Sequence, residues 1–137
     1  MKKVVITGSA SLQDKINHWK EFWENKGYLV IDYPHPISQE NFLEEYPSVH
    51  TEFFRHINET DILFVINEDK NGIIGYLGAE SFAEMCFGVT QNLLYDKKIE
   101  IILLKMPSLN VSSYAEISLW LKLGWIKILP PSLNIGE

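Results

Sequence analysis

The fold follows from two adjoining stretches of sequence, Asp61-Ile62-Leu63-Phe64-Val65-Ile66-Asn67 and Gly75-Tyr76-Leu77-Gly78-Ala79-Glu80-Ser81-Phe82-Ala83-Glu84-Met85-Cys86-Phe87-Gly88. The first stretch is continuously apolar between its polar ends, which is typical of a parallel strand buried on both faces. The second is a glycine-containing turn that leads into a helix with apolar residues on nearly every side. In α/β proteins, a strand, a turn and a helix N-terminus in this order form the edge where ligands bind.

The rest of the chain continues the alternation of strands and helices. The expected strands cover residues 4–6, 28–31, 62–66, 99–104 and 125–129, and the expected helices cover about 12–26, 38–60, 78–94 and 111–123. Ser9 or Ser11 is expected to cap the first helix, and Pro47 to divide the second. The pattern predicts an α/β fold. We expect a single domain over residues 1–137, with a doubly wound, five-stranded parallel sheet in the flavodoxin-like order 2-1-3-4-5.

Composition excludes several classes of protein. Acidic residues outnumber basic residues by 18 to 12, so the formal charge is −6. Binding to a nucleic-acid polymer or an anionic membrane rests on many Lys and Arg contacts, so neither partner is expected. No apolar run approaches the roughly 20 residues of a membrane span, and we expect a cytoplasmic protein. The single cysteine, Cys86, forms no internal disulfide, and the histidines lack metal-ligand spacing, so no metal or cofactor is expected.

A sheet with this strand order places its crevice at the carboxyl ends of strands one and three. The first end is followed by Gly8, Ser9 and Ser11, where a tight turn and the amides of a helix start could hold a phosphate or a carboxylate. The alternative is an ordinary capping turn. Beyond strand three, Asp69 could do acid/base work or bind sugar hydroxyls, or it could serve turn formation alone.

Two carboxylates, Glu80 and Glu84, lie one turn apart on the helix that begins at this edge. A helical count assigns the core-facing stripe to Ala79, Phe82, Ala83, Cys86 and Thr90. Glu84 then lies nearer the opposite side, where it could be solvated. Met85, Phe87 and Val89 make that side apolar too, so it should contact a neighbour. Together with Trp120 and Trp125 near the other end of the chain, these residues lead us to expect a homo-oligomer.

Aromatic residues complete the set of candidates. Tyr76 could hydrogen-bond a carboxylate or a ribose, or it could cover the sheet as an aromatic plug. His35, between two prolines beside the crevice, is the histidine expected to contact a ligand. The four tryptophans occur at core spacing and are expected to pack.

The glycine turn followed by Glu84-Met85-Cys86-Phe87-Gly88 resembles the nucleoside 2-deoxyribosyltransferase superfamily, in which a glycine-containing loop leads to a helix carrying a glutamate. The resemblance extends in outline to residues 4–9, 60–65 and 97–101. It implies that Glu84 attacks the anomeric carbon and forms a covalent glycosyl-enzyme, with retention of configuration. It also implies that Asp69 binds the sugar or base, and that Gly8 and Ser9 lie near a 5′-phosphate. The chain departs from the family at Val5, where a tyrosine is common.

These observations lead to one hypothesis and two alternatives. The first is an enzyme that cleaves or transfers the N-glycosidic bond of a small nucleoside or nucleotide. Its catalytic residues are Glu84 and Asp69, and its substrate-binding residues are Gly8, Ser9, Ser11, Tyr76, Gly78 and Glu80. The second is a non-catalytic nucleotide-binding or sensing domain on the same scaffold. The third is a flavin-binding module, although no aromatic pair flanks a candidate flavin loop.

Overall fold

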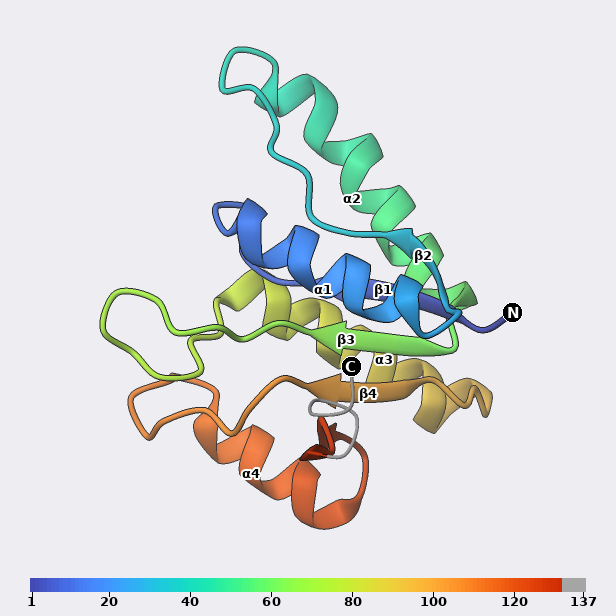
Figure 1. Ribbon diagram of the computed structural model, residues 1–137, viewed down its shortest axis with the longest axis vertical. Coiled ribbons are helices and arrows are strands. Elements are labelled where there is room, and N and C mark those ends of the chain that lie inside the picture. The colour runs from blue at the N-terminus through green and yellow to red at the C-terminus, as the bar shows by residue number, and fades with distance from the viewer. Residues whose placement is uncertain (132–137) are drawn as a thin grey trace.

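The computed structural model describes residues 1–131 as one parallel sheet with helices on both faces (Figure 1). The elements follow in the order β1 (Lys3–Thr7), α1 (Gln13–Asn25), β2 (Leu29–Asp32), α2 (Phe42–Glu59), β3 (Ile62–Val65), α3 (Ala79–Tyr95), β4 (Glu100–Leu103), α4 (Tyr114–Leu123) and β5 (Lys127–Ile128). All neighbouring strands are parallel, in the order β2-β1-β3-β4-β5. The predicted flavodoxin-like α/β fold is confirmed.

The sheet separates two apolar cores because side chains alternate between its faces along each strand. On one face, β1 and β3 pack against α1, which contributes Trp19 and Trp23. On the other face, α2, α3 and α4 cover a core that includes Val5 and Leu63. Thr7 follows Val5 by two residues, so the same alternation directs its side chain toward the α3 face. This register is what brings a strand hydroxyl within reach of the third helix.

The second helix differs from its prediction, because α2 is one continuous helix through Pro47. Proline removes a single backbone donor, whose acceptor would be the carbonyl of Leu43. That turn is exposed, so water can satisfy the carbonyl, and the helix continues. Farther along α2, Phe53 and Ile57 are buried in the core. In Figure 1, the N-terminal half of α2 and the loop before it extend beyond the rest of the molecule.

The buried face of α3 also differs from its prediction. The side that packs on the sheet carries Ser81, Glu84, Met85, Gly88 and Val89, whereas Ala83 and Thr90 are exposed. Gly88 explains the choice, because a Cβ there would lie 3.2 Å from Ile101 Cδ1 and 3.3 Å from Leu63 Cδ2. The helix therefore approaches the sheet closely at Gly88.

The corrected packing of α3 removes one part of the basis for the expected homo-oligomer. Met85 and Val89 were expected to contact a second subunit, but both are buried in the core of this chain. Phe87 packs edge-to-face on Phe54 of α2, with the ring centroids 4.8 Å apart. These residues thus have their partners within one molecule. Trp125, in the other part of that basis, is 37% exposed.

Several element boundaries are also corrected. The N-cap of α1 is Leu12, with no side-chain cap, while the hydroxyls of Ser9 and Ser11 bond each other at 2.8 Å. The fourth helix begins at Tyr114 rather than at residue 111, and β5 is shorter than expected. No helix within residues 1–131 combines the length and apolar character needed to cross a bilayer.

Candidate functional site

A small cavity of about 90 Å³ lies at the carboxyl ends of β1 and β2, between the first turn of α3 and the middle of α2. Its lining combines backbone from the β1 turn with aromatic and titratable side chains from α2, α3 and the loop after β2. The lining residues are Gly8, Ala10, Asp32, Tyr33, Pro34, His35, Ile37, Tyr46, Val49, His50, Phe53, Glu80 and Glu84. Three of them are carboxylates: Asp32 at the end of β2, and Glu80 and Glu84 in the first two turns of α3.

Glu84 is the buried carboxylate of this cavity, with 8% of its surface exposed. The hydroxyl of Thr7, itself fully buried at the end of β1, donates a hydrogen bond to Glu84 Oε1. Burial raises the pKa of Glu84 to about 7, and the nearby charges of Glu80 and Asp32 add to the increase, while the Thr7 hydrogen bond opposes it. A carboxyl group whose pKa lies near 7 is partly ionised at neutral pH, so it can accept a hydrogen bond or form a covalent bond there.

Glu80 lies one turn before Glu84 and is held from across the cavity. The hydroxyl of Tyr46 donates a 2.7 Å hydrogen bond to Glu80 Oε2, and His50 Nδ1 lies 3.1 Å from the same hydroxyl. The two rings on α2 are stacked, with centroids 5.0 Å apart. The hydrogen bond to Glu80 is the main cause that raises the pKa of Tyr46 to about 12. Tyr46 therefore keeps its proton and acts as a donor.

Asp32, the last residue of β2, supplies the third carboxylate. The register of the β1–β2 pair shifts between Val4 and Val5, so that Val5 lies opposite Asp32. Such irregularities re-aim side chains. Asp32 Oδ2 lies 2.7 Å from His56 Nδ1 on α2, and Asp32 Oδ1 lies 3.7 Å from His35 Nε2. His35 is thus beside the cavity, as the sequence predicted.

A second cavity, of about 260 Å³, adjoins the first across Gly8, Ala10 and Glu80. Its cation is Lys70, which donates a 2.9 Å hydrogen bond to Ser9 Oγ and lies 5.4 Å from the centre of the Tyr76 ring. The N-terminus of α3 opens on this cavity, and its N-cap residue Gly78 provides no side-chain cap.

Ser81, in the first turn of α3, also lines this second cavity. It is 7% exposed, and its hydroxyl has no hydrogen-bond partner within residues 1–131. Free amides at a helix start and an ammonium group are the usual elements of an anion site.

Gly8 separates the two cavities because the chain approaches β3 closely there. A Cβ on Gly8 would lie only 2.4 Å from Ile66 Cγ1, so no larger residue fits without a shift. Tyr76, Gly78 and Ser9, three of the predicted substrate-binding residues, line the second cavity. Ser11 lies outside the lining of both cavities and bonds Ser9 twice, through the two hydroxyls at 2.8 Å and from its backbone amide to Ser9 Oγ at 3.4 Å.

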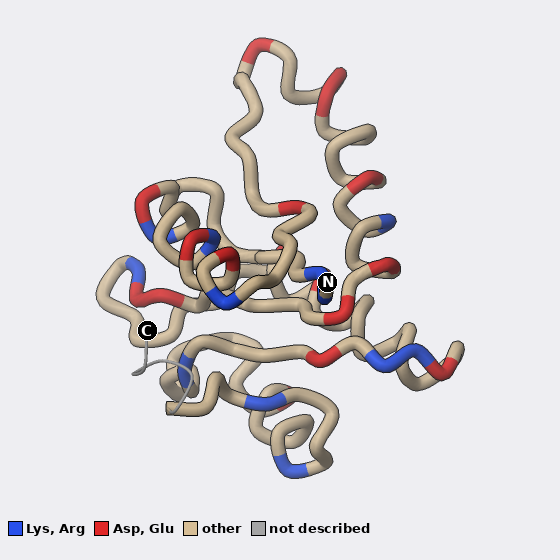
Figure 2. Tube along the Cα trace, turned by 45° about the vertical axis from the view of Figure 1, so that its right-hand side comes forward, with Lys and Arg blue, Asp and Glu red and all other residues tan. Residues whose placement is uncertain are grey.

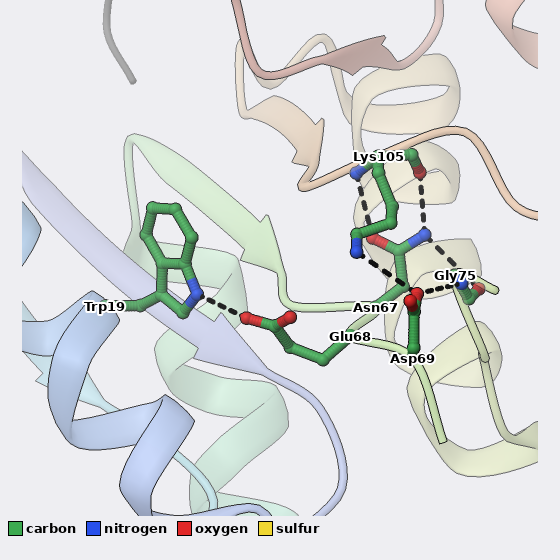
Figure 3. A network of polar contacts seen from close by, with 6 residues as sticks. All are labelled: Trp19, Asn67, Glu68, Asp69, Gly75 and Lys105. Carbon is green, nitrogen blue, oxygen red and sulfur yellow. Dashed lines mark hydrogen bonds and ion pairs between the residues drawn. The ribbon is translucent and has the colours of Figure 1, made fainter. Parts of the chain in front are cut away.

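Asp69 lies outside the lining of both cavities. Its Oδ1 accepts hydrogen bonds from the backbone of Gly75, at 2.9 Å, and from Lys105 Nζ, at 3.1 Å (Figure 3). The Gly75 bond, followed by Lys105, lowers the pKa of Asp69. The neighbouring Asn67 binds the backbone of Lys105 in both directions, at 2.7 and 3.2 Å. This cluster fastens the loop after β3 to the end of β4.

Asp32, Tyr46 and His50 line the cavity but were not among the residues predicted from the sequence. Asp32 ends a strand, a position that favours ligand contact, but the predicted strand order places the crevice at strands one and three. Tyr46 and His50 are one helical turn apart, at a spacing that places both on one face. Because Pro47 was expected to divide this helix between Tyr46 and His50, the sequence did not predict that the two residues share a face.

A comparison of this chain with protein-family models, curated proteins and solved structures found no match. The strand order is one that many unrelated functions share, so it does not choose among them. No cluster of side chains within residues 1–131 could hold a metal ion. The chemistry of the site is therefore inferred from its own residues.

Proposed function

We propose that the protein cleaves or transfers the N-glycosidic bond of a small nucleoside or nucleotide, with Glu84 as the nucleophile. The observation that carries this proposal is the buried Glu84 carboxylate, which opens on a cavity at the meeting of two strand ends. A buried carboxylate is costly unless it is paired or used. Glu84 has one hydroxyl partner, Thr7, and no cationic partner within residues 1–131.

The proposed reaction has two steps. In the first, the ionised Glu84 oxygen forms a bond to the anomeric carbon while the bond from that carbon to the base nitrogen breaks. The base leaves with the electron pair and takes up a proton. In the second step, water or another base attacks the anomeric carbon and releases Glu84, with overall retention. The Thr7 hydroxyl holds Oε1 and orients the carboxylate.

The second cavity suggests that a 5′-phosphate is part of the substrate. Lys70, Ser9 and the free amides of the α3 start surround it. It adjoins the Glu84 cavity across Gly8, as a sugar bound between the base and the phosphate requires. A substrate with a 5′-phosphate would place its anion on Lys70 and its anomeric carbon toward Glu84.

The alternative function is nucleotide binding without chemistry. It is favoured by Asp69, the carboxylate expected to assist Glu84, which is engaged in loop hydrogen bonds rather than lining a cavity. This alternative predicts saturable binding of a nucleotide with no release of the base.

The experiment that decides is chromatographic measurement of free base from a panel of nucleosides and 5′-monophosphates. The E84Q variant is tested beside the wild type, with E21Q as the matched control, since Glu21 is an exposed glutamate on α1. We expect release by the wild type and by E21Q but none by E84Q. Nucleotides that raise the melting temperature without any release would overturn the enzymatic proposal and support the alternative.

A further inference from the structure

We propose that Glu80 is the general acid and base that serves Glu84, and that His50 supplies its protons through the hydroxyl of Tyr46. This inference rests on the proposed glycosyl chemistry and assigns to Glu80 the acid/base role that the sequence had suggested for Asp69. The contacts that carry it are the chain of hydrogen bonds from α2 to Glu80 and the position of all four groups around one cavity.

The two glutamates open on one cavity from neighbouring positions of one helix. Residues four apart on a helix are neighbours on its surface. In a retaining glycosidase, two neighbouring carboxyl groups cooperate, one attacking while the other protonates the leaving group. Both Glu80 and Glu84 line the cavity. The first two turns of α3 therefore present two carboxyl groups to the cavity from one rigid element.

The hydrogen bonds give the relay a direction. Tyr46 donates to Glu80 Oε2 at 2.7 Å, which leaves the phenolic oxygen free to accept the proton on His50 Nδ1, 3.1 Å away. The other oxygen, Glu80 Oε1, makes no hydrogen bond within residues 1–131. That oxygen is thus the one that can face a leaving base. The stacked rings of Tyr46 and His50 hold the donors in line.

The protons balance over one turnover. As the base leaves, Glu80 gives it a proton, Tyr46 passes its proton to Glu80, and the imidazolium of His50 passes the Nδ1 proton to Tyr46. The net result of the first step is a protonated base, a protonated Glu80 and a neutral His50. In the second step, Glu80 Oε1 takes a proton from the attacking water while the proton on Oε2 returns to Tyr46 and the Tyr46 proton returns to His50, so the proton lost by water replaces the one that the base carried away.

Several charged and titratable groups surround this proton relay. The groups that face Glu80 come from four segments: Glu84 on α3, Tyr46 and His50 on α2, Asp32 and His35 around the end of β2, and Lys70 on the loop after β3. The raised pKa of Tyr46 shows that its proton stays on the phenol at rest, as a relay group requires.

A purely structural role for the Tyr46–Glu80 bond makes a different prediction. In that case the bond only ties α2 to α3, and its loss affects every substrate equally. A general acid is needed for a poor leaving group but not for one that departs as a stable anion. The test is therefore a pair of substrates with the same sugar: the best natural nucleoside or nucleotide, and the 4-nitrophenyl glycoside.

The E80Q variant keeps the size of Glu80 and an acceptor for Tyr46, so it preserves the packing. We expect the natural substrate to lose about a hundredfold or more in kcat. The first-turnover burst of 4-nitrophenolate should stay within about threefold of the wild type. Equal losses on both substrates, or no loss on either, would overturn the role of Glu80. Failure of the wild type to cleave either substrate would overturn the proposed function as well, whereas cleavage that needs Glu84 but not Glu80 overturns this inference alone.

The relay is tested by removing its outer members. We expect H50A to lower kcat on the natural substrate about tenfold and added imidazole to restore it, because the small base can reach Tyr46. Y46F should show a similar loss that imidazole does not restore. The exposed His18 on α1 provides the control. The H18A variant should keep the kcat of the wild type, and added imidazole should not change it. An H50A variant that imidazole leaves unchanged would overturn the relay.

Discussion

Glu84 and Asp69 both lie at the edge of the sheet where the strands end, but their surroundings have opposite effects on a carboxylate. Burial beside other acidic groups raises the pKa of Glu84 to about 7, whereas hydrogen bonds from Gly75 and Lys105 lower that of Asp69. Asp69 is exposed and its bonds join two loops, while Glu84 is buried and opens on a cavity.

The comparison teaches that a carboxylate at the edge where the strands end has one of two roles. Where backbone amides and a lysine occupy its oxygens, as at Asp69, the residue stabilises the loop. Where the oxygens face a cavity and have few hydrogen-bond or charge partners, as at Glu84, burying the carboxylate costs free energy of folding. That cost indicates a use other than stabilising the fold. Figure 2 shows that acidic positions recur along the neighbouring α2, with one basic position among them.

The largest effect expected from this comparison is on turnover. E84Q should lower base release by about a thousandfold or more, since it removes the nucleophile. D69N should leave turnover per folded molecule within about threefold and lower the melting temperature instead, because it weakens a charged hydrogen bond. Base release and thermal unfolding are measured on both variants. A D69N variant that unfolds like the wild type but has lost its turnover would reverse the assignment of the two carboxylates.

The next effect is on stability as a function of pH. An unperturbed glutamate titrates near 4.5, but Glu84 in the fold titrates near 7. Between these values the folded state keeps a proton that the unfolded state has lost, so stability falls as the pH rises. The shift corresponds to a loss of about 3 kcal/mol. Urea unfolding at about pH 5 and about pH 8 measures it.

The glutamine variant provides the control for this pH dependence. In E84Q the decrease in unfolding free energy should largely disappear. Asp69 acts with the opposite sign, because its lowered pKa adds stability above its ordinary value of 3.8 that is lost only as the pH falls through the lowered value. The contribution of Asp69 to the unfolding free energy therefore stays constant over the pH range that tests Glu84. A wild type whose stability rises across that range would contradict the burial of Glu84 as an acid.

The smallest effect concerns Lys70, which lies next to Asp69 in sequence but on the cavity side. Its ammonium bonds Ser9 at 2.9 Å in the second cavity. If that cavity holds a 5′-phosphate, K70A should raise the KM of a nucleoside monophosphate about tenfold, with little change for the unphosphorylated nucleoside. The ratio of the two KM values measures this preference. Equal changes for both substrates would show that Lys70 orders the loop rather than binding phosphate.

The sequence predicted the fold well because strand and helix patterns are local. Continuous apolar runs such as residues 62–66 fixed buried parallel strands, and their alternation with helices fixed the order of the sheet. The prediction was weaker wherever an outcome depended on how closely two elements approach. Gly88 lets α3 approach the sheet closely, and this contact decided which face of the helix is buried.

The site was predicted only in part for the same reason. Glu84, Glu80, Gly8 and Ser9 follow from the topology, because each lies at a strand end or a helix start. Tyr46 and His50 required knowing that α2 continues through Pro47 and lies over the edge. Asp32 depended on a register shift that leaves no sequence pattern.

The most direct test is a carbon-13 NMR titration of the carboxyl groups, which follows Glu84 and Asp69 in one sample, with E84Q and D69N used to assign the two resonances. We predict that Glu84 titrates near pH 7 and Asp69 below its ordinary value of 3.8. Titration of both groups near their ordinary values would contradict the distinction between a buried reactive carboxylate and a loop-binding one, and with it the basis for the proposed chemistry.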